Sequence, residues 1–351
     1  MYKYSKKEAY LPIWKTDIIY NETVVMVKED DELPYGNLLF EPREIISVKD
    51  YTLSHTFNKD EYVYENGKLS LTNNSTCPYL TLDQINGIDM PDGFGLVKND
   101  SGLDGKSIAF TTGTGIIKHQ IAVTYSHDDK WLGPITTYMG DKLPNVMEKL
   151  NKGIDIKLVL LGDSIAAGCG SSGDLTIEPC LEPIGLSFAN ELRSNFTSKI
   201  EFINKSQGGT MSNWGKGEAV NRVASYNPDL VVLAFGMNDG SAGVRPEDYK
   251  ANIEHIIKTA QDKNPQTEFI LISTILANPI TKQNHRQLEY VKMNTELTKE
   301  YKGVINIDMS NFSKELYKKK RGADFLANHI NHPSDFLVRG YIMNLVSALV
   351  K

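Results

Sequence analysis

The sequence predicts an α/β fold for its second half, with a parallel β-sheet covered by helices on both faces, and an all-β domain before it. Two observations carry this prediction. From about residue 154, short apolar runs alternate with segments of helical periodicity, which is the pattern of βαβ units. Before about residue 140, β-type segments follow one another between turn signals without helical periodicity.

The second half should contain parallel strands, each an apolar run that is followed by a helical segment. The strands are expected near residues 156–161, 200–204, 230–235, 268–274 and 303–307. The helices are expected near residues 183–195, 215–225, 246–263, 284–301 and 334–350. This alternation is close to the flavodoxin-like arrangement, in which ligands bind at the carboxyl ends of the strands.

The first half has the pattern of an antiparallel β-sandwich or jelly roll, which we predict for residues 1–140. Its strands are expected at residues 23–27, 44–48, 62–64, 68–71, 107–110 and 120–125. Turn signals between them include Glu65-Asn66-Gly67 and Pro91-Asp92-Gly93. Residues 141–153 should form a linker with a short helix over 143–150, and the α/β domain should span residues 154–351.

The composition is that of a globular protein with room for two packed cores, since 40% of its 351 residues are hydrophobic and 23% are charged. The net charge of −6 leaves no basic surface for nucleic acid, so we expect no nucleic-acid partner. No apolar stretch is long enough to span a membrane, and the amino terminus lacks the apolar segment of a signal peptide. We therefore expect a cytoplasmic protein without a membrane partner, and a homo-oligomer stays open.

The cysteines Cys77, Cys169 and Cys180 are odd in number, which argues against a disulfide framework. Their spacing is not that of a metal site, so we expect reduced thiols. The sequence also lacks a phosphate-binding Gly-Lys-Ser/Thr loop and a His-Glu-x-x-His zinc pair. We therefore expect neither a metal nor a cofactor.

The tripeptide Gly162-Asp163-Ser164 directly follows the first expected strand of the second half. A buried parallel strand delivers such a serine to the sheet edge where reactive groups gather. The serine also opens a helix, where backbone N–H groups point at incoming negative charge. Capping of that helix is the ordinary alternative for Ser164, and a turn-bracing role is expected for Asp163.

Further polar or glycine residues follow the next strands. Gly208 and Gly209 come after the second strand, Asn238 comes after the third, and His332-Pro333 lies near the carboxyl terminus. Each has an ordinary interpretation, as a turn glycine, a strand-end asparagine or a loop histidine. Because carboxyl ends of parallel strands meet at one edge, however, they are expected beside Ser164, where they could serve acyl transfer.

In this order, Ser164, Gly209, Asn238 and His332 resemble the residues that name the SGNH/GDSL hydrolases. The resemblance covers residues 154–351 and implies a serine esterase with Ser164 as nucleophile and His332 as base. It also implies an oxyanion hole made by the backbone N–H groups of Ser164 and Gly209 and the side-chain amide of Asn238. Gly208 replaces Gly209 as donor if the loop register shifts by one residue.

One position departs from the family pattern, because His329 stands where an aspartate usually precedes the catalytic histidine by three residues. A neutral imidazole cannot hold His332 as a carboxylate does. Three alternatives stay open: a backbone carbonyl orients His332 in a Ser–His dyad, a carboxylate of Asp335 or Asp324 substitutes, or His329 itself takes part. We favour the dyad.

The expected substrates are short-chain, acetyl esters of carbohydrates, because a β-sandwich before an SGNH domain resembles the architecture of carbohydrate O-acetyl esterases. A small-molecule or oligosaccharide ester is therefore the expected partner. A general short-chain or lipid esterase is the first alternative, although no long apolar segment offers a lid. A non-catalytic carbohydrate-binding protein is the second, favoured by the loss of the usual aspartate.

The run from Gly168 to Gly173 also fits the glycine pattern of a dinucleotide-binding loop, which would indicate an oxidoreductase. Its first glycine comes seven residues after the strand, outside the strand-to-helix turn. No acidic residue follows the next strand, where such a loop needs one. The polar run fits better as the mouth of a serine pocket.

Overall fold

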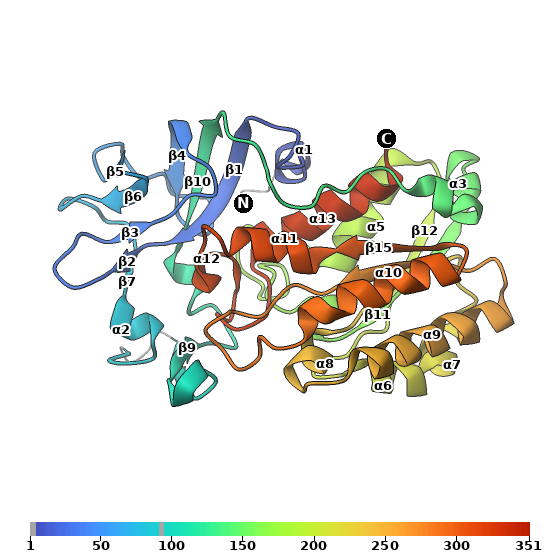
Figure 1. The fold of residues 1–351 in the computed structure, drawn as a ribbon. Helices are drawn as coiled ribbons and strands as arrows, with labels where there is room; N and C mark the ends of the chain where they lie inside the picture. The colour runs from blue at the N-terminus through green and yellow to red at the C-terminus, as the bar shows by residue number, and fades with distance from the viewer. Residues whose placement is uncertain (1–4, 91–94) are drawn as a thin grey trace.

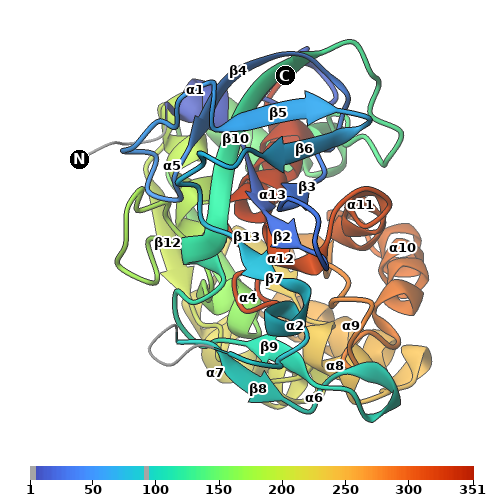
Figure 2. The same cartoon turned by 90° about the vertical axis from the view of Figure 1, so that its left-hand side faces the viewer.

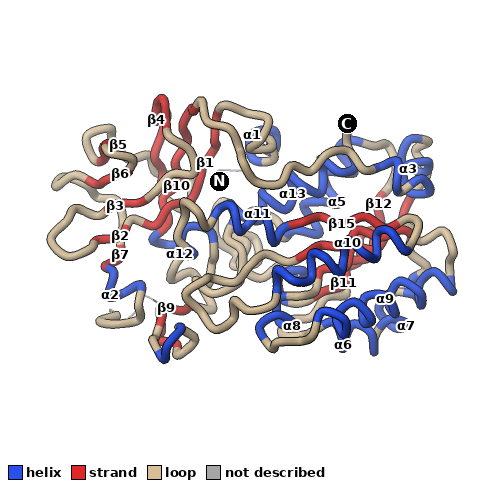
Figure 3. The backbone as a smooth tube through the Cα atoms, viewed as in Figure 1, coloured by secondary structure: helices blue, strands red, loops and turns tan. Residues whose placement is uncertain are grey.

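The computed structural model describes residues 5–90 and 95–351, and has strands gathered at one end and helices around a sheet at the other (Figures 1 and 3). The turn signal at residues 91–93 lies outside the described residues. Below, "β region" means residues 5–127 and "α/β region" means residues 144–351. We predicted a linker at residues 141–153 between them, and the helix expected there at 143–150 is present as α3 (Pro144–Asn151). The domain boundaries stay a prediction.

The β region contains two larger sheets and a two-stranded hairpin. The antiparallel first sheet has the order β1-β10-β4, with bounds Ile18–Val25, Gln120–His127 and Pro42–Lys49. The second has the order β5-β6-β3-β2-β7, with bounds Tyr62–Glu65, Lys68–Leu71, Tyr35–Gly36, Val27–Lys28 and Leu80–Thr81. The hairpin pairs β8 (Val97–Asn99) with β9 (Ile108–Phe110).

Each segment expected as a strand in the β region contains a strand, but the one expected at residues 23–27 is divided between β1 and β2, which belong to different sheets. The antiparallel prediction was also incomplete. β2 and β7 pair in parallel, and β3, β7 and β8 were not predicted. These strands have two or three residues, too few to show an alternation of polar and apolar side chains. A one-turn helix, α2 (Leu82–Ile85), was missed as well, and it begins at a capping box made by Thr81 and Gln84. The sandwich or jelly-roll topology stays a prediction.

The α/β region is built on a five-stranded parallel sheet, which confirms the predicted fold class. Its order is β12-β11-β13-β14-β15, the flavodoxin-like order. The strands are Ile200–Asn204, Ile156–Gly162, Leu230–Ala234, Glu268–Ser273 and Val304–Asp308. Each lies within about one residue of its expected bounds, because strands buried on both faces form continuous apolar runs.

Alternate side chains of the central strand β11 enter different cores. Leu158 and Leu160 pack with the helices α3 (Pro144–Asn151), α5 (Ile184–Asn195), α11 (Met309–Leu316) and α13 (Asp335–Leu349). Val159 and Leu161 pack with α9 (Pro246–Lys263) and α10 (Tyr290–Glu300) on the other face. The two helical layers are visible above and below the sheet in Figure 1. The period of two along a strand thus places helices on both faces.

The helix predicted at residues 215–225 was wrong in extent. The chain instead forms α6 (Ser212–Gly217), α7 (Ala219–Arg222) and a 3₁₀ turn at Ala224–Tyr226. Gly215 and Gly217 lower the helix propensity, and Val223 adopts the non-helical angles φ −127° and ψ −70°. The helix expected to begin at Ser164 is present as the one-turn α4 (Ser164–Ala167). Short helices at Met237–Ser241 (α8) and Gly322–Phe325 (α12) were not predicted, because one turn carries no periodic signal.

The two regions share one apolar cluster, which runs from Val24 and Val123 of the first sheet to Phe325 and Leu337 of the α/β region. Figure 2 looks onto the β region and shows α12 and α13 behind its strands. We call this contact the seam. It is defined by residues whose side chains or backbone groups form hydrogen bonds across it: Glu22, Thr23, Val25, Lys320 and Asp324. In the described ranges, no helix has the length and apolar character needed to cross a membrane.

Candidate active site

The first site element lies where β11 ends. Gly162 lies so close to β13 that a Cβ atom on it would be 2.3 Å from the carbonyl oxygen of Ala234, which explains the glycine. Asp163 then caps α4, since its Oδ1 accepts the Ile165 N–H at 3.0 Å. The capping role belongs to Asp163, so Ser164 is the first helical residue. Its N–H is one that the helix does not itself use.

The structure brings Ser164 and His332 together although 168 residues separate them. The Ser164 hydroxyl Oγ and His332 Nε2 are 2.9 Å apart, at hydrogen-bond distance. His332 lies on the loop between α12 and α13. Burial lowers the pKa of this imidazole to about 4, although the charge of Asp174 acts in the opposite direction. His332 is therefore neutral near pH 7 and can accept a proton from the serine.

The residues expected to form an oxyanion hole lie at the same edge of the sheet. A Cβ atom on Gly208 would be 3.8 Å from the Cβ of Ser164. Gly209 has a φ of +74°, and a Cβ atom on it would have no other atom within 4 Å. Asn238 is the second residue of α8, and its Nδ2 donates to the Thr210 carbonyl at 2.8 Å. A side-chain amide has two N–H donors, so this bond fixes the group and leaves one donor.

Two buried carboxyl groups support these loops. Asp239 accepts the Ser212 N–H at 3.0 Å and the Ser212 hydroxyl at 2.5 Å, which ties the loop after β12 to the loop after β13. Burial raises the pKa of Asp239, and raises the pKa of Asp163 from 3.8 to about 7. The contacts of Asp239 with Ser212 and of Asp163 with Ile165 agree with the bracing roles expected for these two aspartates from the sequence.

The two aspartates considered as partners of His332 bond elsewhere. Asp335 accepts the Ser172 N–H at 2.8 Å and the Ser172 hydroxyl at 2.7 Å, so it ties the loop after α4 to the start of α13. Asp324 accepts the N–H groups of Val25 and Arg321, each at 2.7 Å, and belongs to the seam. Among the described residues, neither carboxylate forms a hydrogen bond with His332. An orienting role for either one stays a prediction.

His329 also turns away from His332. Its ring Nδ1 lies 3.1 Å from the carbonyl oxygen of Ala109 in β9, and burial lowers the pKa of this imidazole to about 4. Its backbone has a φ of +66°, and its carbonyl accepts from Asn278 Nδ2 at 2.8 Å. His329 thus connects the loop to the β region. The dyad that we favoured needs the His332 Nδ1–H group to donate to a backbone carbonyl. Among the described residues, no such hydrogen bond is present.

A cavity of about 210 Å³ lies beside His332, and its lining includes Cys169 and Gly170 of the run that we expected at the mouth of a serine pocket. It is lined by Phe110, Thr111, Thr112 and Gly113 of the β region, and by Cys169, Gly170, Asp174, Leu175, Ala327, Asn328 and His332 of the α/β region. Gly170 belongs to the run once compared with a dinucleotide loop, and a Cβ atom on it would be 3.2 Å from the Cβ of His332. The glycine lets this loop pack behind the histidine loop.

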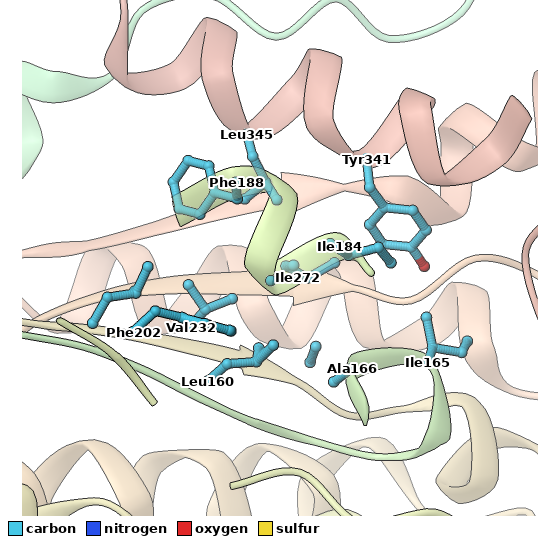
Figure 4. Close-up of a pocket in the computed structure, with 13 residues that line it drawn as sticks. Leu160, Ile165, Ala166, Ile184, Phe188, Phe202, Val232, Ile272, Tyr341 and Leu345 are labelled. Carbon is cyan, nitrogen blue, oxygen red and sulfur yellow. The ribbon is translucent and has the colours of Figure 1, made fainter. Parts of the chain in front are cut away.

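A second, apolar cavity lies beneath α4, where side chains of the sheet, α5 and α13 converge (Figure 4). Ile165 and Ala166, the neighbours of Ser164, form one wall, and Phe188 and Tyr341 face them. Its volume of about 10 Å³ is at the lower limit for one water molecule. The core beneath the serine is therefore closed. No cluster of three or more potential metal-ligating side chains occurs in the part of the chain that the structure describes.

The chain matches the GDSL-like lipase/acylhydrolase family over residues 160–336, about half of its length. No curated protein matches it. It is similar to the solved structure of a two-domain esterase active on acetylated mannans, at 20% identity and a TM-score of 0.48, over 61% of this chain and 55% of that one. The match thus spans little more than half of that esterase.

Two further solved structures are similar over a smaller part of this chain. One is a catalytic mutant of an acetylxylan esterase from Geobacillus stearothermophilus, with 17% identity, a TM-score of 0.44, and 55% of this chain and 94% of that one covered. The other is the acetyl xylan esterase AlAXEase, with 19% identity, a TM-score of 0.45, and coverage of 56% and 100%. The matched range 160–336 contains the expected nucleophile, both oxyanion loops and the histidine, and by this match the chain belongs to the GDSL-like lipase/acylhydrolase family.

Proposed function

We propose that this protein is a serine esterase that removes short acyl groups from polyhydroxylated alcohols such as sugars. The observation that carries the proposal is the 2.9 Å contact between Ser164 Oγ and His332 Nε2. Ser164 attacks the ester carbonyl while His332 takes its proton, and the carbonyl oxygen becomes negative. The N–H groups of Ser164 and Gly208 or Gly209 and the amide of Asn238 bind this oxyanion.

Collapse of the tetrahedral intermediate breaks the bond to the alcohol. The alcohol leaves with the proton that His332 returns, and the acyl group stays on Ser164. Water then attacks the acyl-serine, His332 accepts the water proton and returns it to Ser164 Oγ, and the carboxylic acid is released. The neutral imidazole expected from its lowered pKa suits the first proton transfer.

The closed core beneath α4 supports a preference for short acyl groups. An acyl chain needs an apolar channel next to the nucleophile, and the apolar cavity there has a volume of only about 10 Å³. Each buried methylene would contribute about 0.8 kcal/mol to binding if a channel existed. Without one, a longer chain stays in water and gains little, so acetyl should be the preferred group.

The cavity beside His332 supports a polar alcohol. Its lining residues include two threonines, Asp174 and Phe110, residue types that can supply hydrogen bonds and an apolar face to a sugar. Because residues 110–113 line it, the β region would take part in selecting the substrate. The substrates named for the similar solved structures are of this class.

The test compares p-nitrophenyl esters from acetate to octanoate with acetylated mono- and oligosaccharides. We expect kcat/KM to be highest for acetate and to fall with chain length, and we expect acetate release from the sugars. A Ser164→Ala variant is the control, and a serine-directed organophosphonate should label Ser164 in the unchanged protein. A maximum at six carbons or longer, without acetate release from sugars, would favour the general or lipid esterase instead.

A further inference from the structure

The loop that carries His332 is closed on itself. Leu326 and Pro333 form a β-bridge at its base, and the Ala327 N–H donates to the His332 carbonyl at 2.8 Å. Within this ring, the position of the usual aspartate is taken by His329, which bonds to the β region. The loop therefore needs another way to hold the imidazole against Ser164.

Asn328 lies one residue earlier, and its side chain fills the ring. Its Oδ1 accepts the N–H groups of Ile330 at 3.0 Å, Asn331 at 2.9 Å and His332 at 2.9 Å. Its Nδ2 donates to Asn331 Oδ1 at 3.0 Å. The side chain is 6% exposed, so these N–H groups have little water to replace the amide oxygen.

We propose that Asn328 is the positioning residue of His332, and that it replaces the missing aspartate by holding the backbone of the histidine instead of its ring. The inference rests on the proposed esterase function. Three backbone donors that converge on one oxygen fix the path of the chain up to the Cα of His332. The close approach of Gly170 to its Cβ then limits the side chain to few rotamers.

This arrangement differs from a triad in its consequence. A triad aspartate holds the imidazole and stabilises the imidazolium that forms during the reaction. The neutral Asn328 amide supplies only the position. The titratable groups around the imidazole are Asp174 and Cys169 across the cavity, Asp163 beside Ser164, and His329 on the same loop.

The experiment compares Asn328→Ala, Asn328→Asp and Asn331→Ala, with Ser164→Ala as the inactive reference. Asn331→Ala is the matched control, because it removes an amide of the same loop that accepts only from Asn328. We expect Asn328→Ala to lower kcat for p-nitrophenyl acetate by about 10- to 100-fold with KM unchanged, as a misplaced base does. Asn331→Ala should stay within about twofold of the unchanged protein.

Asn328→Asp should restore most of kcat, because a carboxylate can accept the same three N–H groups. Its negative charge should also raise the pKa of His332 and move the acidic limb of kcat/KM to higher pH. The pKa shift follows from the added charge in any case, so the recovery of kcat is the decisive readout. A role in folding alone would lower the folded fraction and leave kcat per folded molecule unchanged in all three variants. Equal losses in Asn328→Asp and Asn328→Ala, or an equal loss in Asn331→Ala, would overturn the inference.

A structural readout separates this inference from the proposed function. A crystal structure of Asn328→Ala should show the Ser164–His332 contact lengthened or lost. Persistence of that contact at hydrogen-bond distance overturns the positioning role, whatever the activity is. Esterase activity that does not exceed that of Ser164→Ala would instead overturn the proposed function. If Asn328→Ala does not fold, Asn328→Ser, which keeps one acceptor oxygen, takes its place in both measurements.

Discussion

The seam and the active site are both buried and polar, yet their polar groups are satisfied to different degrees. At the seam, Lys320 is fully buried and donates to Glu22 at 2.5 Å and to the carbonyls of Asn37 and Thr23 at 2.8 and 3.1 Å. Glu22 also accepts the Leu39 N–H at 2.9 Å and the Tyr125 hydroxyl at 2.5 Å. Each charge meets an opposite charge and further partners.

At the candidate active site, the buried titratable groups lack, within the part of the chain that the structure describes, the oppositely charged partners that are found at the seam. His332 has its pKa lowered to about 4, and Asp163 has its pKa raised to about 7, in each case chiefly by burial. Both shifts favour the uncharged form of the group. The difference teaches that burial alone does not mark a functional group in this protein. Groups fixed by complementary partners hold the two regions together, whereas burial keeps the His332 imidazole uncharged and able to accept a proton from Ser164.

The largest effect on kcat is expected at the candidate active site, and it should leave the stability provided by the seam unchanged. Replacing Ser164 by alanine should lower kcat by at least ~10³-fold, because the covalent step is lost. The melting temperature should change little, since the hydrogen-bond partner of the hydroxyl is the His332 ring. Steady-state kinetics and thermal unfolding measure the two quantities. Activity that survives in this variant would remove Ser164 from the mechanism.

The converse is expected at the seam. Lys320→Ala leaves Glu22 buried without its cation and should destabilise the protein by about 3–5 kcal/mol. Urea denaturation measures the loss. The kcat per folded molecule should stay the same, because the contacts of Lys320, including its 3.9 Å ion pair with Asp324, lie at the seam and involve neither Ser164 nor His332. A variant that keeps its stability and loses kcat would reverse the comparison.

The pH dependence of stability should carry a contribution from Asp163. Its pKa is about 7 when folded, above the ordinary value of 3.8, so between these values the folded state binds the extra proton. The free energy of unfolding therefore falls as pH rises from about 4 to 7 and levels off above 7, by a total on the order of 4 kcal/mol. Asp163→Asn should flatten this part of the profile while keeping a capping oxygen. An unchanged slope in denaturation curves from pH 5 to 8 would contradict the shift.

The pH dependence of catalysis should also show the buried base. Because the pKa of His332 is lowered to about 4, kcat/KM should not fall as pH decreases through 6.5, where an ordinary imidazole becomes protonated. The decline should begin only near pH 5, about tenfold per unit below the pKa. Rates measured from pH 4.5 to 8 test this, and a limb near 6.5 would show an unshifted base.

Only a small effect on activity is expected from Asp335→Asn. Its carboxylate holds Ser172, and an amide keeps one acceptor oxygen for that contact. We expect less than ~10-fold loss of kcat, against the ~10⁴-fold that loss of a true triad aspartate causes. A collapse of activity would show that Asp335 reaches His332 during the reaction, and would return it to the site.

Much of the α/β region was predictable because its signals are local. The strands β11 to β15 are apolar runs, and Ser164, Gly208 and Asn238 follow strand ends within a few residues. The division of residues 212–226 into α6, α7 and a 3₁₀ turn was not predictable, because glycines interrupt the helical pattern. The two-residue strands were not predictable either, because they are too short to show a period. The family motif located His332 but gave no information on what holds it.

The sequence by itself determined the order of strands and helices, the serine at a sheet edge and the departure at His329, since each depends on neighbouring residues. Only the tertiary structure decided which groups meet. Lys320 and Glu22 lie 298 residues apart, and His329 and Ala109 lie 220 apart. The chain pattern cannot rank such pairs, because their bonds form only after both regions pack and water is removed from the seam.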